Sequence, residues 1–425
     1  MMDGKPYPIP KTWAESSIGT AVVKTKQRDP RKKPDEVFQY VDVSAVSNTS
    51  FKITSAAPTL GSEAPSRARK AIQTDDVLFA TVRPTLKRIA LVPPELDGAI
   101  ASTGYCVLRC DKAKADPGFL YSFLITDHFN ARMAGLERGA SYPAVRDSDV
   151  TASWFPLPPL PEQKKIAHIL STVQRAIEAQ ERIIQTTTEL KKALMHKLFT
   201  EGLRHEPQKQ TEIGPVPESW EVVELGEFFQ IKHGYAFDGE FFKQAGDYIL
   251  MTPGHFHEEG GFRDQGEKTK FFTGDIPQDY VLAKDDLVVA MTEQKSGLLG
   301  SAAFVPEGNR YLHNQRLGLI VDLDTKRLSK RYLFHVFNLP HLRVEVAKTS
   351  TGSKVKHTSP TKLRAVKVGI PPTVEEQEEI ASALSATQQK INVAANKKAQ
   401  LQDLFRTLLH ELMTAKTRVH ELKSF

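Results

Sequence analysis

The chain has 425 residues, of which 40% are hydrophobic and 25% charged, with a formal net charge of +6. This length suits roughly two to four domains, and no apolar run approaches the roughly 18 residues that cross a bilayer, so no membrane partner is expected. The N-terminal segment lacks the apolar centre of a secretory signal, which favours a cytoplasmic protein. Two cysteines, Cys106 and Cys110, cannot build a disulfide framework or a zinc site.

The first region along the chain, residues 1–160, has a mixed pattern. A basic run, KTKQRDPRKK, occupies residues 24–33, and short strand-like segments such as VLFATV are separated by connections rich in Gly, Pro, Ser and Thr. The pair Asp75-Asp76 directly before VLFATV predicts a turn that leads into a strand. A second polar and basic loop, RGASYPAVRDSD, lies at residues 138–149 near the end of the region.

A long helix is predicted within residues 161–206. The prolines before it hold the entering chain extended, Pro161 is tolerated in a first helical turn, and Glu162 is favourable beside the positive end of the helix dipole. We expect this helix to run to about Glu201 and to end at Gly202.

The rest of the chain repeats this order, with a second mixed region at 207–373 and a second long helix within 374–425. The repeat pairs Trp13 with Trp220, Asp75-Asp76 with Asp285-Asp286, Tyr121 with Tyr332, and Glu162-Gln163 with Glu376-Gln377, at offsets that grow from 207 to 214. Offsets that grow in order predict a tandem duplication of about 210 residues. The second helix begins with a capping-box pattern, Thr373 followed by Glu376, and is expected to run to roughly Lys416.

Both helices carry an apolar stripe with alternating spacings of four and three residues. Seven of ten such positions from Ile166 are apolar, and so are eight of the ten positions that lie 214 residues later. This pattern is typical of a coiled-coil seam. The predicted seam consists of Ile166, Leu170, Val173, Ile177, Ile184, Leu194, Leu198, Ile380, Leu384, Ile391, Leu401, Phe405, Leu408 and Leu412.

A helix of roughly 40 residues is about 60 Å long, too long to bury its stripe against one compact domain. The obvious partner is the other helix. We therefore predict an α+β fold with two mixed α/β domains, joined by two long helices that form an antiparallel coiled coil, and with a pseudo-two-fold internal repeat. The alternative, two unrelated core helices, does not explain the shared register.

These segments resemble the specificity subunit of type I restriction–modification systems, and the similarity covers the whole chain. The residues that carry the resemblance are PLPPLPEQKKIAHIL and KLFTEGL within 156–203, a looser IPPTVEEQ at 370–377, STGY at 102–105 and LHNQRLGLI at 312–320. The resemblance implies a non-catalytic subunit that recognises DNA. Residues 1–160 and 207–373 would be target-recognition domains, each binding one half of a bipartite asymmetric site, and residues 161–206 and 374–425 would be conserved spacer helices.

The resemblance also implies partners and cofactors. The partners would be double-stranded DNA, two methyltransferase subunits that dock on the helices and, in the full complex, motor-nuclease subunits. S-adenosylmethionine, ATP and magnesium would belong to those partner subunits, and this chain would bind no cofactor.

Contacts to DNA come mainly from Lys and Arg on phosphates and from a few polar side chains on bases. The candidates in the first region are Lys24, Lys26, Arg28, Arg31, Lys32, Lys33, Arg67, Arg69, Lys70, Arg83, Lys87, Arg88, Arg138, Ser141, Tyr142 and Arg146. The candidates in the second region are Lys232, His233, Tyr235, Lys295, Asn314, Arg316, Ser353, Lys354, Lys356 and His357. The loop STGSKVKHTSP at 350–360 is the expected counterpart of residues 138–149.

Two alternatives remain open. The first is a magnesium-dependent nuclease, since Asp285 and Asp286 followed by Glu293 and Lys295 imitate a metal-binding triad, although the equivalent Arg83-x-Thr85 could not hold a metal. The second is a protein-interaction scaffold without DNA binding. No phosphate-binding loop and no Asn/Asp-Pro-Pro-Tyr/Phe segment occurs in the sequence, and the paired histidines at 255 and 257 lack nearby cysteines, so we predict neither a catalytic nor a metal site.

Overall fold

The computed structural model describes residues 7–294 and 297–420 and divides into two compact units. Unit 1 takes the chain up to Arg182 and from Ala395 onward, and unit 2 takes Ile183–Ala394. The long helices α5 (Leu160–Glu201) and α9 (Val374–Met413) each contribute one half to each unit. In the described part of the chain, no helix has the length and apolarity that a membrane span requires.

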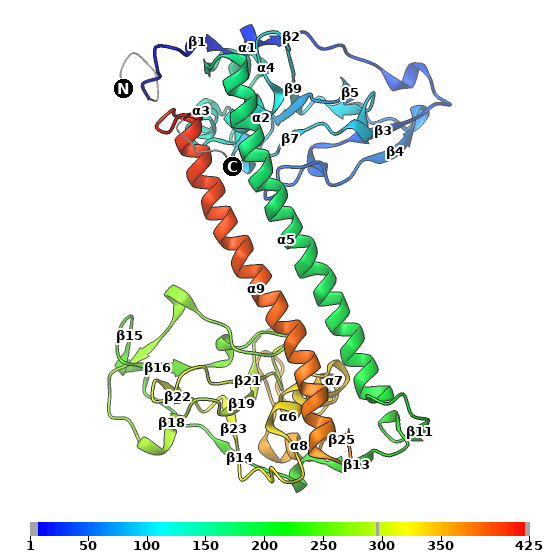
Figure 1. Cartoon of the computed structure of the whole chain (residues 1–425), viewed down its shortest axis with the longest axis vertical. Helices are drawn as coiled ribbons and strands as arrows, with labels where there is room; N and C mark the ends of the chain where they lie inside the picture. The colour runs from blue at the N-terminus through cyan, green and yellow to red at the C-terminus, as the bar shows by residue number, and fades with distance from the viewer. Residues whose placement is uncertain (1–6, 295–296, 421–425) are drawn as a thin grey trace. The chain divides into compact units, whose positions relative to one another are not determined.

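Unit 1 contains two four-stranded sheets with helices at one side (Figure 1). Its strands are β1 (Ala14–Ser17), β2 (Val22–Val23), β3 (Val37–Val41), β4 (Ala57–Leu60), β5 (Ala68–Ala71), β6 (Val77–Ala80), β7 (Ile89–Leu91), β8 (Ile100–Ser102), β9 (Tyr105–Cys110) and β10 (Trp154–Leu157). Its short helices are α1 (Ile18–Ala21), α2 (Pro117–Ile125), α3 (Asp127–Leu136) and α4 (Asp147–Thr151).

Unit 2 follows the same plan after an added hairpin of β11 (Gln208–Thr211) and β12 (Gly214–Pro217). Its other strands are β13 (Glu221–Glu224), β14 (Gln230–His233), β15 (Phe242–Lys243), β16 (Tyr248–Met251), β17 (Phe271–Phe272), β18 (Val281–Leu282), β19 (Leu287–Ala290), β20 (Thr292–Glu293), β21 (Ala302–Phe304), β22 (Tyr311–His313), β23 (Leu317–Val321), β24 (Lys356–His357) and β25 (Lys367–Ile370). Its short helices are α6 (Lys330–Phe337), α7 (Pro340–Lys348) and α8 (Pro360–Arg364).

The sheet topology confirms the predicted duplication. One sheet has the order β2-β9-β6-β7 in unit 1 and β14-β23-β19-β21 in unit 2. The other sheet has β3 and β8 as a parallel pair in unit 1, and unit 2 repeats this with β16 and β22. The strands directly before the long helices, β10 and β25, each form a short antiparallel pair, β10 with β1 and β25 with β13. The domain boundaries proposed from the sequence stay a prediction.

The two aspartate pairs have the same role in both units. Asp75 and Asp285 have left-handed backbones, with φ of 71° and 63°. Asp76 and Asp286 each accept a hydrogen bond of 2.8 Å from the backbone N–H three residues earlier. Each pair therefore closes a tight turn that leads into a fully buried strand, β6 or β19, as the sequence indicates.

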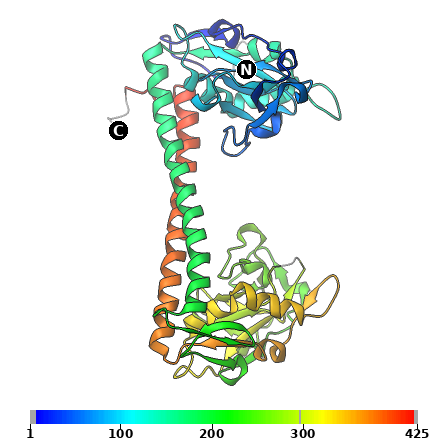
Figure 2. The same cartoon turned by 90° about the vertical axis from the view of Figure 1, so that its right-hand side faces the viewer.

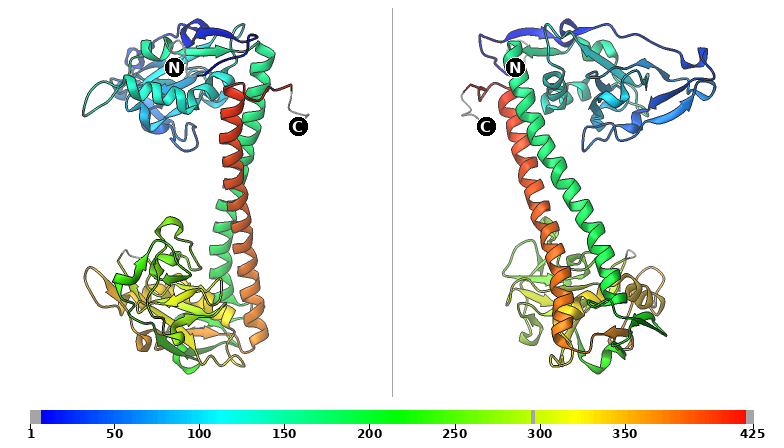
Figure 3. Two further views of the ribbon diagram at one scale, coloured as in Figure 1. Left: turned by 90° about the vertical axis from the view of Figure 1, so that its left-hand side faces the viewer. Right: turned by 45° about the vertical axis from the view of Figure 1, so that its right-hand side comes forward.

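The long helices run antiparallel within each unit, as predicted. In unit 1, Glu162 near the start of α5 pairs with Arg418, and Glu181 further along α5 pairs with Lys398. The partner residue number falls as the number along α5 rises, which is the pattern of antiparallel segments. In unit 2, Lys191 Nζ of α5 donates to Gln388 Oε1 of α9 at 2.7 Å. Figure 2 and Figure 3 show the two helices side by side in each unit.

The predicted seam positions lie on the inner faces of these helices. Ile166, Leu170, Ile177, Leu198, Ile380, Leu384 and Leu412 are buried, and Val173, Ile184, Leu194, Ile391, Leu401, Phe405 and Leu408 are half-buried. Helix α5 ends at Glu201 before a left-handed Gly202, as expected. Helix α9 ends at Met413, a few residues before the expected Lys416, and Ala415 just beyond it has a left-handed backbone.

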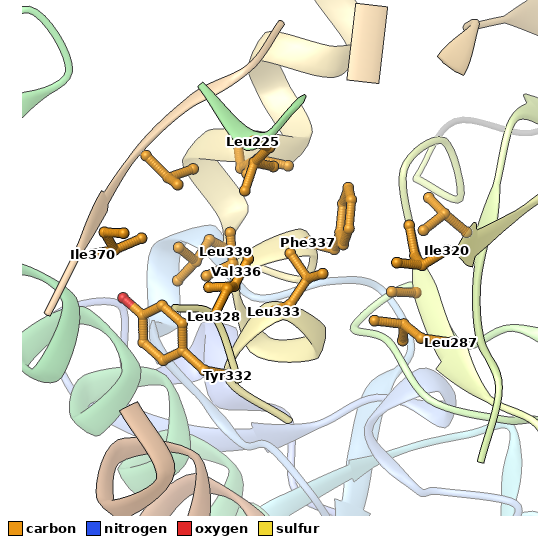
Figure 4. Close-up of a cluster of buried hydrophobic side chains, with 14 of the residues drawn as sticks. Leu225, Leu287, Ile320, Leu328, Tyr332, Leu333, Val336, Phe337, Leu339 and Ile370 are labelled. Carbon is orange, nitrogen blue, oxygen red and sulfur yellow. The ribbon is translucent and has the colours of Figure 1, made fainter. Parts of the chain in front are cut away.

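The buried core of unit 2 joins the recognition region to the helix pair. Figure 4 shows Tyr332, Val336 and Phe337 of α6 among buried aliphatic side chains from the neighbouring strands and loops. The same core takes in residues of both long helices, including Leu198 and Leu384. In unit 1, Phe119 and Phe123 of α2 take the corresponding place, together with Ile166, Leu170 and Leu412. Each recognition region is thus packed directly onto both helices.

A buried glutamine at the start of each long helix explains the repeated Glu-Gln motif. Gln163 Nε2 donates to the carbonyls of Lys114 and Pro158 at 3.0 and 2.8 Å, and its Oε1 accepts from the N–H of Asp116 at 2.9 Å. Gln377 makes the same three bonds, at 3.0, 3.3 and 2.8 Å, to residues at equivalent places. These bonds fix the proline-rich entry and the start of α2 or α6 against the first turn of the helix.

Candidate nucleic-acid interface

The basic loop at residues 138–149 folds back on the turn that follows β6. Arg83 N–H donates to the carbonyl of Pro143 at 2.7 Å, and Ala144 forms isolated bridges with Val82 and Arg138. The ion pair of Arg138 with Asp149, at 2.7 Å, closes the base of the loop. The loop is therefore held in one shape while its tip, around Ser141 and Tyr142, faces solvent.

Arg83 and Tyr142 form an exposed pair at this tip. The side chain of Tyr142 is 74% exposed, and the guanidinium of Arg83 lies 5.3 Å from the centre of its ring. Arg83 has a left-handed backbone, with φ of 49°, which is uncommon for a residue with a side chain. A planar cation stacked on an aromatic ring is a surface that contacts bases and phosphates well.

The two other basic groups of the first region lie beside one another. The segment 24–33 runs along β5, with Arg28 N–H donating to Arg69 O and Ala71 N–H donating to Lys26 O. Lys70 pairs with Asp147 at 2.7 Å, which joins this surface to the end of the basic loop. The fold thus brings the clusters at 24–33, 67–70 and 138–146 onto one surface.

Many of these cations already have an acidic neighbour. Ion pairs join Arg28 and Lys33 to Glu36, Arg31 and Arg69 to Asp29, and Lys87 to Asp127. Most of these side chains are at the surface, where an ion pair contributes little and a phosphate can replace the carboxylate. Lys24, Lys26, Lys32 and Arg67 are exposed on the same region.

Arg88 differs from the other candidates of the first region because its guanidinium bonds to the backbone of the segment after β3. Its Nη1 donates to the backbone carbonyls of Ser44, at 3.2 Å, and of Val46. These bonds hold the segment after β3, so the geometry favours a structural role for this arginine. Its contact with DNA stays a prediction.

In unit 2 the loop at 350–360 occupies the equivalent place. Its strand β24 pairs with β20, with His357 opposite Thr292 and Lys356 opposite Glu293. The tip carries an exposed Ser353 and Lys354, after Gly352 with φ of 101°. Both units therefore present a hairpin-like loop against the segment that follows the central strand β6 or β19.

Glu293 occupies the place that Arg83 holds in unit 1, yet it is buried. Its Oε2 accepts three hydrogen bonds of 2.9 Å from the backbone N–H groups of Gly297, Leu298 and Leu299. A carboxylate satisfied by three amides is a loop anchor and has little capacity left for a metal. Lys295, the other residue of the imitated triad, lies outside the described residues.

A second polar surface of unit 2 lies along β14 and the turn between β22 and β23. Lys232 Nζ donates to Asp279 O at 2.7 Å and lies 4.7 Å from the centre of the Tyr280 ring. Tyr235 lies against Tyr280, with ring centres 5.2 Å apart, and is partly exposed. His233 is exposed nearby. The stack resembles the Arg83–Tyr142 pair in chemistry, although it lies on different elements.

The turn between β22 and β23 carries two of the candidate residues, Asn314 and Arg316, in different surroundings. Asn314 is buried, and its Oδ1 accepts from the N–H of Arg316 at 3.0 Å, so it shapes the turn. Gln315 and Arg316 are exposed. Tyr280 and Gln315 share this surface but are not among the sequence-based candidates: nothing local signals Tyr280, whereas an Asn that starts a turn could have indicated that the next residue points outward.

No group of three or more His, Cys, Asp or Glu side chains suited to a metal ion occurs within residues 7–294 and 297–420. His255 is buried, and its Nδ1 accepts from the N–H of Thr252 at 3.2 Å; burial lowers the pKa of its imidazole to about 4. Burial likewise raises the pKa of the Cys106 and Cys110 thiols to about 12, so both stay uncharged. These groups pack in the interior.

Comparison with known proteins gives consistent matches. The family model described as "Type I restriction modification DNA specificity domain" matches residues 10–188 and 217–403. The type I restriction enzyme MjaVIII specificity subunit of Methanocaldococcus jannaschii is 28% identical over 336 residues, which cover 76% of either chain. The putative MjaX specificity subunit of the same organism is 26% identical over 353 residues, covering 81% of this chain and 79% of the relative.

Two solved structures are also similar. One, described as the structural basis of complex assembly and conformational transition of the type I R-M system, is 29% identical, covers 97% of this chain and 100% of its own, and has a TM-score of 0.54. The S subunit of a type I restriction-modification system from M. genitalium shares the fold, with a TM-score of 0.62 at 15% identity, over 94% of this chain and 96% of its own.

Proposed function

The chain belongs to the family of type I restriction–modification DNA specificity proteins, and from this premise we propose that each of its two recognition domains binds one half of a bipartite DNA sequence. One observation carries this proposal. Two domains that share the order of one four-stranded sheet and a parallel strand pair in the other hold a polar loop in the same place, after β6 and after β19, and fill it with different side chains. Equivalent loops that carry different side chains suit two half-sites of different sequence.

We infer that the base-contacting residues lie at these tips and that the lysine and arginine clusters bind phosphates. Arg83, Tyr142, Ser353 and Lys354 are all exposed and held by backbone bonds at the loop bases. Phosphate contacts from the clusters would make the affinity fall steeply with salt. The scaffold alternative predicts no such dependence.

We propose that the helix pair fixes the gap between the half-sites and docks two copies of a methyltransferase subunit. Support comes from a repeated exposed patch on the helices, which we call the helix patch. It consists of Glu189, Leu190, Lys192 and His196 on α5 and of Asp403, Leu404, Arg406 and His410 on α9, at a constant offset of 214. Leu190 is 58% exposed and Leu404 is 43% exposed. A large apolar residue flanked by one acid and one base, twice over, suits two identical partners.

We further propose that the chain is non-catalytic and that S-adenosylmethionine, ATP and magnesium belong to its methyltransferase and motor-nuclease partners. The buried position of Glu293 supports this, because the nuclease alternative depends on that carboxylate. Incubation of the purified chain with DNA and magnesium is expected to give no cleavage.

The DNA-recognition proposal is tested by selecting bound sequences from a random library with the assembled complex. Tyr142→Ala is expected to weaken binding about tenfold or more and to relax one half-site, because a lost base contact costs about 1–3 kcal/mol. Lys354→Ala is the matched variant and should affect the other half-site only. Relaxation of both half-sites by either substitution would contradict separate recognition.

The docking proposal is tested by native mass spectrometry of the complex. Leu190→Arg and Leu404→Arg should each leave one methyltransferase subunit bound, and the double variant should leave none. Val37→Arg, at a 65% exposed valine of β3 that lies on neither long helix, is the control and should not change the stoichiometry. Two bound subunits in the double variant would rule the patch out.

A further inference from the structure

A short loop of unit 1 connects its second sheet, which has the strand order β4-β3-β8-β5, to both long helices. This loop, residues 47–53, is called the strap loop. An isolated bridge between Val46 and Ile53 closes its ends, and Ser47 N–H donates to Lys52 O at 2.9 Å. The Ser47 Oγ accepts from the N–H of Ser50 at 3.1 Å. The strap loop is therefore a compact, internally bonded structure.

Two residues at its tip reach the helices. Lys52 Nζ pairs with Glu178 Oε1 of α5 at 2.7 Å, and the Glu178 side chain is only 20% exposed. Phe51 and Phe405 of α9 are both half-buried and pack against the same hydrophobic core. They also line the same two pockets, of about 430 and 770 Å³. The strap loop thus contacts α5 by charge and lies against α9 by apolar packing.

The backbone at Phe51 indicates that this placement is enforced. Phe51 has φ of 53°, a left-handed conformation that costs a bulky residue about 1 kcal/mol or more. Its carbonyl accepts a hydrogen bond from the hydroxyl of Tyr121 at 3.0 Å. Burial raises the pKa of that hydroxyl, and the nearby Glu178 carboxylate raises it further, so Tyr121 remains a donor. Three contacts therefore hold the strap loop in place: the ion pair of Lys52 with α5, the packing of the Phe51 ring beside α9, and the hydrogen bond from Tyr121 of α2.

The strap loop matters because the second sheet packs against the first sheet, including Leu78 and Ala90, in a core that is separate from the one shared with the helices. Val46 and Ile53 belong to a cluster with Val41, Ile72 and Ala101 that is separate from the core shared with the helices. That sheet carries β5 and, beside it, the basic segment 24–33. Its attachment to the helices through the strap loop is therefore distinct from the packing of α2.

The equivalent loop of unit 2 uses other chemistry. The bridge between Phe256 and Phe262 closes it, and its tip holds Gly260 and Gly261 in place of an aromatic residue. Gly260 lies so close to the Asn338 side chain that a methyl group would overlap with it. The loop of unit 2 thus places glycine backbone against Asn338, directly after α6, where the strap loop presents an aromatic side chain.

We propose that the strap loop fixes the orientation of the second sheet of unit 1 on the helix pair, and that the Lys52–Glu178 pair thereby restricts the gap lengths the chain accepts between half-sites. Lys52 and Phe51 are positioning residues in this proposal. It rests on the proposed function, since a gap exists only for a bipartite target.

The test uses the assembled complex and a DNA library in which the two wild-type half-sites are separated by gaps of varied length. Lys52→Glu places like charges together and is expected to lower affinity at the preferred gap about threefold or more, while neighbouring gap lengths become accepted. Glu178→Lys should act in the same way. The double variant Lys52→Glu/Glu178→Lys restores the ion pair and should restore the narrow gap preference.

A second variant, Phe51→Gly, removes the ring and the strain together and should also broaden the gap preference, without rescue by the charge reversal. An unchanged gap distribution in Lys52→Glu and Phe51→Gly would overturn the proposal, and so would altered half-site bases at an unchanged gap. Absence of any bipartite preference in the wild-type complex would instead refute the proposed function itself.

Discussion

The two recognition domains share a backbone plan but differ in chemistry at the position that follows the central strand. In unit 1 this position is Arg83, an exposed arginine with a left-handed backbone that stacks on Tyr142. In unit 2 it is Glu293, buried and bonded to three backbone amides. The comparison teaches that the duplicated unit keeps its strand order and its hydrogen-bonded joints while the side chains at the tips change freely.

Lowering the pH is expected to give the largest difference in stability between the two units. Burial lowers the pKa of His255 and His313 to about 4 and of His335 to about 3, all in unit 2. In unit 1 burial lowers the pKa of His128 to about 4. These histidines stay neutral in the folded state, whereas in the unfolded state they take up protons below their ordinary value of 6.5. Stability is therefore lost as pH falls from 6.5 towards 4.

Burial also lowers the pKa of His257 and His341 in unit 2, so unit 2 is expected to lose more unfolding free energy than unit 1 over this range. Hydrogen exchange with mass spectrometry at pH 7 and pH 5 measures each unit separately. Equal loss of protection in both units would break this comparison.

Glu293→Ala should give the next largest effect. It leaves three backbone donors without their acceptor and is expected to cost unit 2 about 3–5 kcal/mol of unfolding free energy. The matched Arg83→Ala removes an exposed side chain and should change the stability of unit 1 by less than about 0.5 kcal/mol. Denaturant unfolding measures both, and a stable Glu293→Ala variant would contradict the anchoring role.

Replacing the buried glutamine should destabilise the two units to the same extent. Gln163→Leu and Gln377→Leu each remove three hydrogen bonds and leave buried polar backbone groups unpaired, which costs about 2–4 kcal/mol. The two variants should destabilise their own units by similar amounts in chemical denaturation. A large effect from one and none from the other would show that the joints are not equivalent.

The smallest predicted difference concerns the glutamate beside each glutamine. Glu162 accepts from Trp13 Nε1 at 3.2 Å and pairs with Arg418 at 2.9 and 3.0 Å. The equivalent Glu376 Oε1 is buried and has no hydrogen-bond partner among the described residues. Glu162→Gln should therefore cost about 1–2 kcal/mol, whereas Glu376→Gln should be neutral or slightly stabilising. Thermal unfolding of the two variants checks the order.

The repeat, the helix positions and the aspartate turns could be predicted because they depend on local pattern. Apolar spacing and matched offsets survive in a single sequence, and Asp75-Asp76 indicates its turn directly. The antiparallel pairing also followed, because a long narrow stripe needs a partner of equal length.

The candidate site was less predictable because side-chain direction depends on tertiary contacts. Arg88 and Asn314 have the composition of DNA-contacting residues, yet both bond inward to the backbone. Tyr280 joins Lys232 from far along the chain, and the acidic neighbours of the basic clusters come from several segments. The number of Lys and Arg residues in a segment indicates a basic surface. Which of these side chains are exposed depends on the tertiary fold.

The discontinuity of unit 1 has a consequence for biosynthesis. Unit 2 is one continuous stretch, Ile183–Ala394, whereas unit 1 is completed only by residues from Ala395 onward, including Leu409, Leu412 and Met413 of its core. On the ribosome, the domain translated first therefore waits for the last helix half to emerge. We therefore expect the core of unit 1 to stay incomplete, with apolar surface exposed, until the C-terminal half of α9 has been synthesised.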